Sequence, residues 1–290
     1  MSENTKTVTV VIPTYNSAAS IGKCIESIKR QSISPSEIII CDAQSTDGTL
    51  RIAESHGALV LSSVANRSIQ RNIASLSSTS EYILFIDSDM ELSGHVIEEC
   101  LNKMSPEVAA IVIPEIDSGT SYWSLVKGFE RSFYQTAWWL QAARFYNKDL
   151  FMQSGGFDVG LVGPEDWDLD ERIKSYGKIE TISATINHNE GKTSLKKILR
   201  KKSHYSISFD IFSGRHPERA KKCFSIVNRC SLFIKKPSQL VSSPLLLCGL
   251  IVLGFSEVLI ATGLLRLKAI NTTEKSLSQS FNPIRMRNLE

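Results

Sequence analysis

The segment that most constrains the fold of this chain is an apolar run, Tyr82 to Ile86, that ends abruptly in Asp87-Ser88-Asp89. Burial of unpaired carboxylates is costly, so a strand with this ending is expected to deliver its charges to a cleft, a metal ion or a polar ligand. In open α/β sheets, ligands bind at the carboxyl ends of the strands. Two aspartates separated by one residue at such an edge suit a hard divalent cation that bridges protein and phosphate oxygens. A surface turn with solvated aspartates is the alternative interpretation of these three residues alone.

The first 115 residues alternate between apolar, β-branched runs and segments with helical periodicity. Such runs are typical of strands, and recurrence of apolar residues on one face is typical of helices. The predicted strands span residues 7–12, 37–41, 58–61, 82–86 and 109–113, and the predicted helices span 21–28, 49–56, 68–77 and 93–104. This alternation favours an α/β fold with a mainly parallel central sheet and helices on both faces. Residues 7–115 therefore resemble a Rossmann-type nucleotide-binding half, although no G-x-G-x-x-G follows the first strand.

The pattern after residue 115 is less regular. Residues 122–140 are aromatic and amphipathic, which predicts a helix over the sheet, and residues 144–147 are a candidate strand. A turn at residues 155–158 precedes a predicted helix that starts within 163–168 and ends at Tyr176. Acidic residues in a first helical turn interact favourably with the helix dipole, which is an alternative explanation for the acidic residues at 165–168.

Charge is distributed unevenly along the chain, although the net charge is only +3. Residues 1–191 carry 15 basic and 25 acidic side chains, whereas residues 192–236 carry 13 basic and 2 acidic side chains. A basic block of this kind favours anionic partners, either nucleic acid or a membrane surface. No recognised nucleic-acid motif accompanies it, so anionic lipid headgroups are the preferred partner and nucleic acid is not expected.

The run from Leu245 to Leu265 contains a single charge, Glu257, and its length meets the requirement of roughly 20 residues for a membrane span. A re-entrant or in-plane helix is the alternative, because a carboxylate inside hydrocarbon is expensive. Residues 1–7 are polar and show no secretory signal, and the six cysteines have no metal-ligand spacing, which favours free thiols in a reducing compartment. We therefore expect a membrane-associated protein with a cytoplasmic catalytic domain and one C-terminal transmembrane or re-entrant helix.

Six motifs occur in an order that resembles the family 2 glycosyltransferases of the GT-A fold. The motifs are Val11-Ile12-Pro13-Thr14-Tyr15-Asn16, Asp42 to Thr49, Arg71-Asn72, Asp87-Ser88-Asp89, Gly155-Gly156-Phe157-Asp158 and Gly163 to Asp168. The resemblance covers about residues 7–190. One departure is visible, because the family often has a second aspartate and a glycine where this chain has Ala43 and Gln44.

The resemblance implies roles for these residues in the transfer of a sugar from a nucleoside diphosphate donor. The donor loses a charged leaving group while its anomeric carbon gains oxocarbenium character, and a divalent ion such as Mg²⁺ or Mn²⁺ can neutralise the diphosphate. By resemblance, Asp89 ligates the metal, and Asp87 faces the ribose and diphosphate. Asp42 would accept a hydrogen bond from the nucleobase, which favours a UDP-sugar. The remaining implied donor-site residues are Pro13, Tyr15, Asn16, Arg71 and Ser88.

The acceptor must lose a proton as it attacks, and a positioned carboxylate can serve as general base. By resemblance, Asp166 is the expected base with Glu165 as the alternate, and a single displacement implies inversion. His188, in what the sequence presents as a polar loop, is a candidate further metal ligand with Asp87 and Asp89; a solvent-exposed histidine is the alternative.

The predicted organisation is a GT-A catalytic domain over residues 1–191, with a nucleotide-binding half at about 7–115 and an acceptor half at about 116–191. A basic amphipathic membrane-proximal segment (192–243), a hydrophobic membrane helix (244–268) and a polar tail (269–290) follow. The expected reaction is transfer to a lipid-linked, glycan or other membrane-proximal acceptor. A polymerising polysaccharide synthase and a catalytically idle, membrane-tethered nucleotide-sugar-binding scaffold are the alternatives; the Gln-x-x-Arg-Trp motif expected of such synthases is absent from the sequence.

Overall fold

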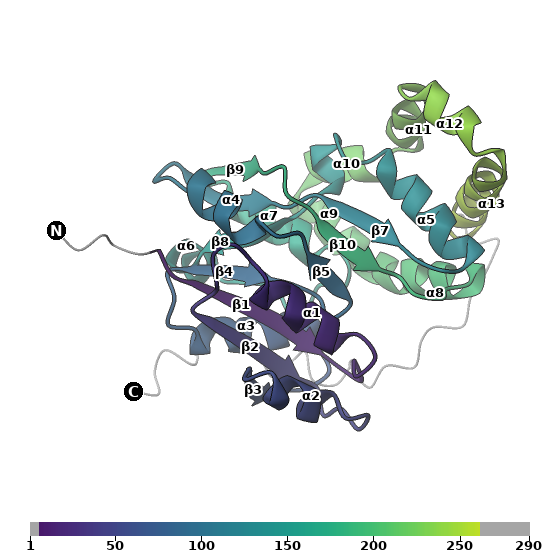
Figure 1. Cartoon of the computed structure of the whole chain (residues 1–290). Coiled ribbons are helices and arrows are strands. Elements are labelled where there is room, and N and C mark those ends of the chain that lie inside the picture. The colour runs from purple at the N-terminus through teal and green to yellow at the C-terminus, as the bar shows by residue number, and fades with distance from the viewer. Residues whose placement is uncertain (1–5, 262–290) are drawn as a thin grey trace.

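The computed structural model describes residues 6–261 and contains a seven-stranded sheet and a three-stranded sheet (Figure 1). The strands are β1 (Val8–Thr14), β2 (Glu37–Asp42), β3 (Leu59–Ser62), β4 (Tyr82–Phe85), β5 (Met90–Leu92), β6 (Val108–Val112), β7 (Glu115–Ser118), β8 (Ala143–Asn147), β9 (Lys178–Thr181) and β10 (Ile186–Asn189). The larger sheet has the order β3-β2-β1-β4-β8-β6-β9, and β8 runs antiparallel to both of its neighbours. The smaller sheet has the order β5-β10-β7.

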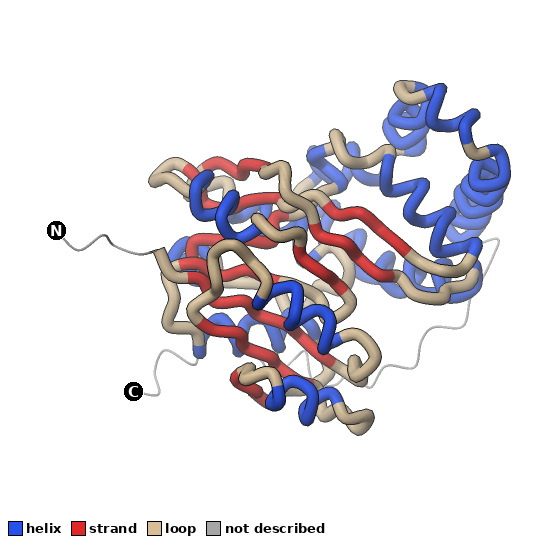
Figure 2. The backbone as a smooth tube through the Cα atoms, viewed as in Figure 1, coloured by secondary structure: helices blue, strands red, loops and turns tan. Residues whose placement is uncertain are grey.

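Helices cover both sheets and form the C-terminal part of the described chain, as the blue segments of Figure 2 show. They are α1 (Ile21–Lys29), α2 (Thr49–Ser55), α3 (Arg67–Ser77), α4 (Val96–Lys103), α5 (Tyr122–Ser132), α6 (Lys148–Gln153), α7 (Glu165–Ile173), α8 (Leu195–Tyr205), α9 (Phe209–Arg215), α10 (Pro217–Phe224), α11 (Ile226–Ile234), α12 (Pro237–Ser242) and α13 (Pro244–Ala261), with 3₁₀ turns at Trp138–Leu140 and Ser206–Ser208.

The core is divided between the two faces of the larger sheet because side chains alternate along each strand. On β1, Val10 and Ile12 pack with apolar residues of α1 and α4 on one face. Val11 faces the opposite cluster, which includes Phe85 of β4 and Leu169 of α7. The predicted α/β sheet with helices on both faces is therefore confirmed, and the strands and helices expected over residues 7–113 are all present within a few residues of their predicted bounds.

The second half of the chain differs from the prediction in several elements. The helix expected over residues 122–140 ends at Ser132, and only a short 3₁₀ turn follows at Trp138–Leu140. Strands β7 and β10 form the smaller sheet with β5, so His188 lies in a strand and not in a polar loop. The strand expected at 144–147 is present as β8, but its antiparallel direction gives the sheet a mixed character.

The C-terminal helix α13 corresponds to the first part of the segment predicted as a membrane span. No helix in residues 6–261 is long and apolar enough to cross a membrane, so the predicted transmembrane helix is not supported. Helix α13 instead packs against α5 so closely that a Cβ atom at Gly249 would lie 2.4 Å from Val126 Cγ2. Glu257 forms ion pairs with Lys202 of α8 and with Arg229 of α11, which explains how this carboxylate is accommodated in an apolar helix. Residues 262–268 and the predicted polar tail at 269–290 lie outside the described residues.

Candidate functional site

Arg71 of α3 lies at the centre of the candidate site and joins two carboxylates that are far apart in the sequence. Its Nη2 lies 2.7 Å from Asp87 Oδ1, just beyond β4, and its Nη1 lies 2.8 Å from Asp166 Oδ1 in the first turn of α7. The Arg71 side chain is 1% exposed, and its guanidinium lies 5.0 Å from the centroid of the Phe157 ring. The fourth, fifth and sixth motifs of the sequence are thus gathered around one buried cation, with Arg71 itself supplied by the third.

Asp87 is held by a second arginine, Arg144 of β8. Arg144 Nη2 lies 3.6 Å from Asp87 Oδ2 and 2.6 Å from Glu115 Oε1. Burial alone would raise the pKa of Asp87, but Arg71 and Arg144 outweigh it and hold the pKa well below its usual range. Asp87 is therefore a fixed anion that is already engaged on both oxygens by the protein, which makes it a poor direct metal ligand in this arrangement.

The two acidic residues that open α7 have different environments. Glu165 is buried and pairs with Arg67 of α3, and although burial opposes it, this contact lowers the pKa of Glu165. Burial raises the pKa of Asp166 above its usual range; Arg71 opposes this increase, whereas the neighbouring Glu165 adds to it. Asp166 retains about a quarter of its side-chain exposure, so it is the more accessible of the two carboxylates.

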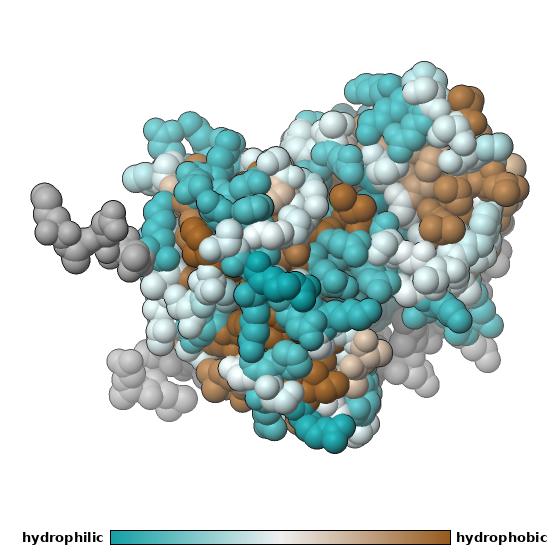
Figure 3. Space-filling model, viewed as in Figure 1, coloured by the Kyte–Doolittle hydropathy of each residue, from teal (hydrophilic) through white to brown (hydrophobic). Residues whose placement is uncertain are grey.

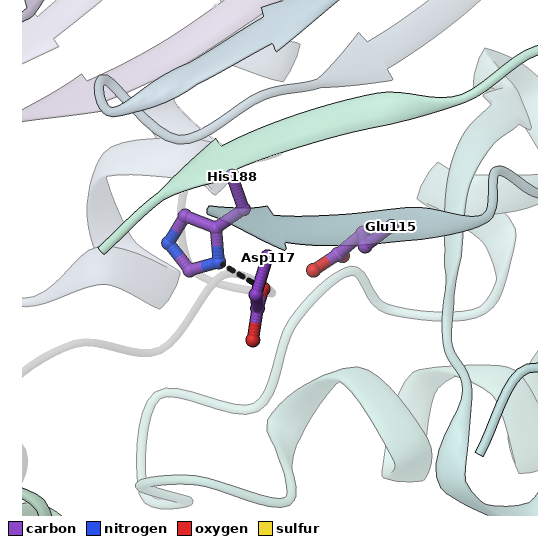
Figure 4. A group of neighbouring side chains, drawn as sticks. All are labelled: Glu115, Asp117 and His188. Carbon is purple, nitrogen blue, oxygen red and sulfur yellow. Dashed lines mark hydrogen bonds and ion pairs between the residues drawn. The ribbon is translucent and has the colours of Figure 1, made fainter. Parts of the chain in front are cut away.

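His188 of β10 lies between carboxylates from three other segments. Its Nε2 lies 3.4 Å from Asp89 Oδ2, and its Nδ1 lies 3.2 Å from Asp117 Oδ1 and 3.5 Å from Glu190 Oε1. Burial lowers the pKa of His188, but the contacts with Asp117 and Asp89 outweigh it and raise the pKa to about 9. Figure 4 shows the ring directed toward Asp117, with Glu115 farther from the ring.

The side chains around His188 offer two alternative groups of candidate metal ligands. Ligand atoms of Glu115, Asp117 and His188 lie within 4.8 Å of one another. Glu115 is already engaged by Arg131 and Arg144, and Asp117 is fully buried against His188 Nδ1 and Arg131. Asp117 is therefore better suited to orient the imidazole, and Glu115 to hold the two arginines, than either is to bind a cation itself.

Asp89 and the Nε2 atom of His188 fit a divalent cation better. Two ligands at right angles, each about 2.1 Å from one ion, are separated by about 3.0 Å, and these two atoms are 3.4 Å apart. Asp89 is also 45% exposed, so it is open to a ligand. A buried carboxylate that contacts the second nitrogen of a ligating histidine is a common arrangement around metals, and Asp117 occupies that position.

The residues at and just after the carboxyl ends of β1 and β2 form the other part of the candidate site. Asp42 is buried and accepts hydrogen bonds from the Thr14 hydroxyl at 2.8 Å, and from the Ser45 hydroxyl and amide at 2.6 and 2.7 Å. It therefore fixes the loop after β2 and has little accepting capacity left for a nucleobase. Asn16 reinforces the same loop, because its side-chain oxygen accepts from the Thr46 amide at 2.9 Å.

The other predicted donor-site residues lie along this edge with different exposures. Pro13 is buried in β1, whereas Tyr15 is 61% exposed and available for a stacking contact. The Ser88 hydroxyl donates to Ser17 Oγ at 2.8 Å and so ties the loop after β4 to the loop after β1. Gln70, adjacent to Arg71, donates to the carbonyl oxygens of Thr14 and Cys41, which connects α3 to both strand ends.

Sequence reasoning missed three residues of this site: Glu115, Asp117 and Arg144. The two acidic residues lie on β7, a short strand with the sequence Glu-Ile-Asp-Ser. Its single apolar residue does not distinguish it from a loop. The available signal was their spacing, because Glu115 and Asp117 are two residues apart and so point to the same face of a strand.

The comparisons with known proteins agree with this fold and this arrangement of motifs. The class they define is the nucleotide-sugar glycosyltransferases of the GT-A fold. The model of the glycosyl transferase family 2 matches residues 9–162, which is more than half of the chain, and the chain therefore belongs to this family.

The chain is also similar to individual proteins of known activity or known structure. It is 26% identical over 221 residues to the chondroitin synthase of Escherichia coli, an alignment that covers 69% of this chain and 32% of that protein. It is similar in structure to the mannosyltransferase PcManGT from Pyrobaculum calidifontis, solved with GDP-Man and Mn²⁺ (TM-score 0.55, 18% identity, 89% of this chain and 79% of that chain). It is also similar to Staphylococcus aureus TarS 1-349, solved with UDP-GlcNAc (TM-score 0.51, 18% identity, 80% of this chain and 78% of that chain). The chain spans about a third of the length of the E. coli protein, and at these identities the two solved structures support the fold alone.

Proposed function

We propose that this protein is an inverting, metal-assisted glycosyltransferase that moves a sugar from a nucleoside diphosphate sugar to a lipid-linked or membrane-proximal acceptor. The observation that carries the proposal is the bridge from Asp87 through Arg71 to Asp166, because it connects the donor-side carboxylate with the candidate base. A surface turn of solvated aspartates has no reason to contain a buried arginine of this kind.

On the donor side, the chain offers both cationic groups and candidate metal ligands. Asp89 and His188 Nε2 would hold a divalent cation, which would supply charge neutralisation for the diphosphate as it leaves. The loops after β1 and β2 would bind the nucleoside, with Tyr15 exposed at their edge. A UDP-sugar is the donor we propose on the family resemblance and not on Asp42, whose oxygens already accept from Thr14 and Ser45; the similar proteins described above were solved with UDP-GlcNAc and with GDP-Man.

On the acceptor side, Asp166 would accept the proton of the attacking hydroxyl. The acceptor oxygen forms a bond to the anomeric carbon, the bond between that carbon and the diphosphate oxygen breaks, and the proton moves to Asp166. Arg71 supports this role because burial raises the pKa of Asp166 and the Arg71 contact opposes that increase, which favours the ionised form that a base requires. Glu165 is less suited to the role, because Arg67 already engages it in a buried contact.

A polymerising reaction is the second candidate function, because proteins similar in sequence include a chondroitin synthase and a hyaluronan synthase. The chain spans 32% and 22% of the lengths of two such synthases, and it lacks the Gln-x-x-Arg-Trp motif expected by resemblance. Transfer of a single sugar is therefore the preferred proposal. Mass spectrometry of the product distinguishes the two, because a synthase would give a ladder of repeating masses.

The direct test is nucleoside diphosphate release from a panel of nucleotide sugars, with Mn²⁺ or Mg²⁺ and a lipid extract as the source of acceptor. We expect the Asp166→Asn variant to lose about 10²–10⁴-fold in activity, because proton transfer by a positioned base contributes a factor of that size. Asp149→Asn, on an exposed carboxylate of α6, is the matched control and should keep full activity. Full turnover by Asp166→Asn would remove the base from the proposal, and an absence of turnover with every donor would favour a nucleotide-sugar-binding scaffold.

A further inference from the structure

Helices α11, α12 and α13 expose large apolar side chains on the outside of the molecule. Figure 3 shows a hydrophobic area where Figure 1 draws these helices. The exposed residues, between 47% and 76% accessible, are Ile226, Val227, Ile234, Val241, Leu245, Ile251, Val252 and Phe255. We call this set the α11–α13 apolar surface.

These side chains are not the edges of an incompletely packed core. The opposite faces of the same helices are buried against α5, where Leu232 and Leu250 pack with Phe129 and Phe133. Leu253 of α13 packs separately with Val126. Helices α11 and α13 are therefore apolar on two sides, and only one of the two is used by the fold. A second apolar face of this extent indicates a partner.

The charge around this surface identifies the chemistry of that partner. Residues 219–256 contain six basic residues and no acidic residue. Three of the six are engaged within the protein. Arg219 is buried and pairs with Asp170 and Glu171, Arg229 pairs with Glu257, and the Lys236 amine donates to the Ser132 carbonyl oxygen. Lys221, Lys222 and Lys235 are exposed: Lys235 directly follows Ile234, and Lys221 and Lys222 lie in α10, shortly before Ile226 in the sequence.

We propose that the α11–α13 apolar surface docks onto an anionic lipid bilayer, with its apolar side chains at the headgroup boundary and its lysines on the lipid phosphates. Amphipathic helices that combine apolar anchors with basic residues bind membranes in this way, and each lysine near an anionic surface contributes about fivefold in affinity. The docking does not depend on the transfer reaction; only its use in presenting a membrane-held acceptor rests on the proposed function.

A second copy of the chain is a less suitable occupant. A two-fold interface would pair this surface with a copy of itself, and residues 219–256 contain no acidic residue to pair with its lysines. An anionic bilayer satisfies both the apolar and the basic parts of the surface at once.

Two native cysteines allow a direct test on the full chain. Cys230 of α11 and Cys248 of α13 are exposed, whereas the other four cysteines are buried. A polarity-sensitive thiol dye should therefore label this region selectively. On vesicles of phosphatidylcholine with about a third phosphatidylglycerol, we expect a blue shift of the dye and sedimentation of the protein; on pure phosphatidylcholine vesicles both signals should be much weaker.

Matched variants separate the apolar and the basic contributions. The Ile251→Ser, Phe255→Ser double variant should lose at least tenfold in vesicle affinity. The Lys221→Gln, Lys235→Gln double variant should also lose at least tenfold, and its vesicle affinity should depend much less on salt concentration. Leu76→Ser, at an exposed apolar position of α3 outside this surface, is the control and should bind as the unmodified protein does. Equal melting temperatures would show that the variants remain folded.

Three results would overturn the proposal: no binding to either vesicle, equal binding to neutral and anionic vesicles, or a dimer in light scattering that the Ile251→Ser, Phe255→Ser variant converts to a monomer. The last result would assign the surface to a second copy. Failure of the proposed transfer reaction is distinguishable, because a protein that binds vesicles but releases no nucleoside diphosphate would retain the docking surface and lose only the enzymatic assignment.

Discussion

Replacement of Arg71 by methionine tests the central feature of the site, because methionine retains much of the apolar stem and removes the charge. The arginine forms two charge-assisted contacts, at 2.7 and 2.8 Å, and is 1% exposed. Loss of one partner of a buried ion pair costs about 3–5 kcal/mol, since the remaining charge is left without compensation. Arg144 still lies 3.6 Å from Asp87, and both carboxylates retain some exposure, so we expect the lower end, about 3 kcal/mol at pH 7.

The measurement is urea unfolding of the metal-free and donor-free protein, since urea does not screen charges. Arg30→Met is the control, because Arg30 forms an exposed pair with Glu26 at 3.5 Å and should cost less than about 0.5 kcal/mol. Arg71→Lys should recover only part of the loss, because a lysine cannot reproduce the forked contact with two carboxylates.

The dependence of this loss on pH follows from Asp87. Its pKa in the folded protein lies well below the unfolded value of about 3.9, so the Arg71 contact contributes stability that is fully present above the unfolded pKa and is lost as pH falls toward the folded pKa. In the Arg71→Met variant, the pKa of Asp87 should be lowered much less, because the Arg71 charge is absent. The difference in unfolding free energy between the two proteins should therefore be full at pH 7 and shrink below about pH 4–5. A loss under 1 kcal/mol at pH 7, or one that is the same at about pH 3, would refute the assignment of Arg71 as a buried counterion.

Two further substitutions test other parts of the site. Asp117→Asn should weaken Mn²⁺ binding by about 10–100-fold in calorimetry without donor, because the carboxylate that orients His188 is lost, and an unchanged affinity would contradict that role. Gln44→Gly should stabilise the protein by about 0.5–1 kcal/mol in urea unfolding, because Gln44 has a φ of +60° and glycine adopts this conformation without strain; a destabilised variant would show that the Gln44 side chain makes a compensating interaction.

The strands that carry the donor side of the site were predictable because their residues are apolar on both faces. Runs such as Val8–Thr14 and Tyr82–Phe85 have no polar alternation, which distinguishes them from loops and from surface helices. Asp87 and Asp89 then stand out because they end such a run. Strand β10 carries asparagines at the exposed positions and a histidine at a buried one, so its four residues do not differ from a polar loop by composition.

Contacts between distant residues were not predictable from a single sequence. Arg71 and Asp166 are 95 positions apart, and nothing in the local pattern of either indicates a partner. The resemblance to a family brought both to attention as separate donor-side and acceptor-side residues, but the bridge between them is a tertiary feature. The predicted membrane span is not supported by the described residues, because apolar content alone does not distinguish a span from a helix with one face on α5 and another exposed.

The charge of the whole site leads to a last prediction about the donor. Seven carboxylates and six cations are joined by ion pairs around Arg71 and His188 when His188 is protonated, so the net charge of the cluster is −1. The carboxylates are Asp87, Asp89, Glu115, Asp117, Glu165, Asp166 and Glu190, and the cations are Arg67, Arg71, Lys127, Arg131, Arg144 and His188.

A diphosphate brought to a cluster of this charge would meet net repulsion unless a divalent cation accompanied it, because nearly every positive group already has a carboxylate partner. We therefore expect UDP to bind at least tenfold more tightly with Mn²⁺ than in the presence of a chelator, as measured by calorimetry, and we expect Asp89→Ala to remove most of that difference. The Asp149→Asn variant should keep it. Equal UDP affinity with and without the metal would mean that arginines of the cluster leave their carboxylates to receive the diphosphate, and the ion pairs of Arg71 and Arg144 would then describe only the donor-free state.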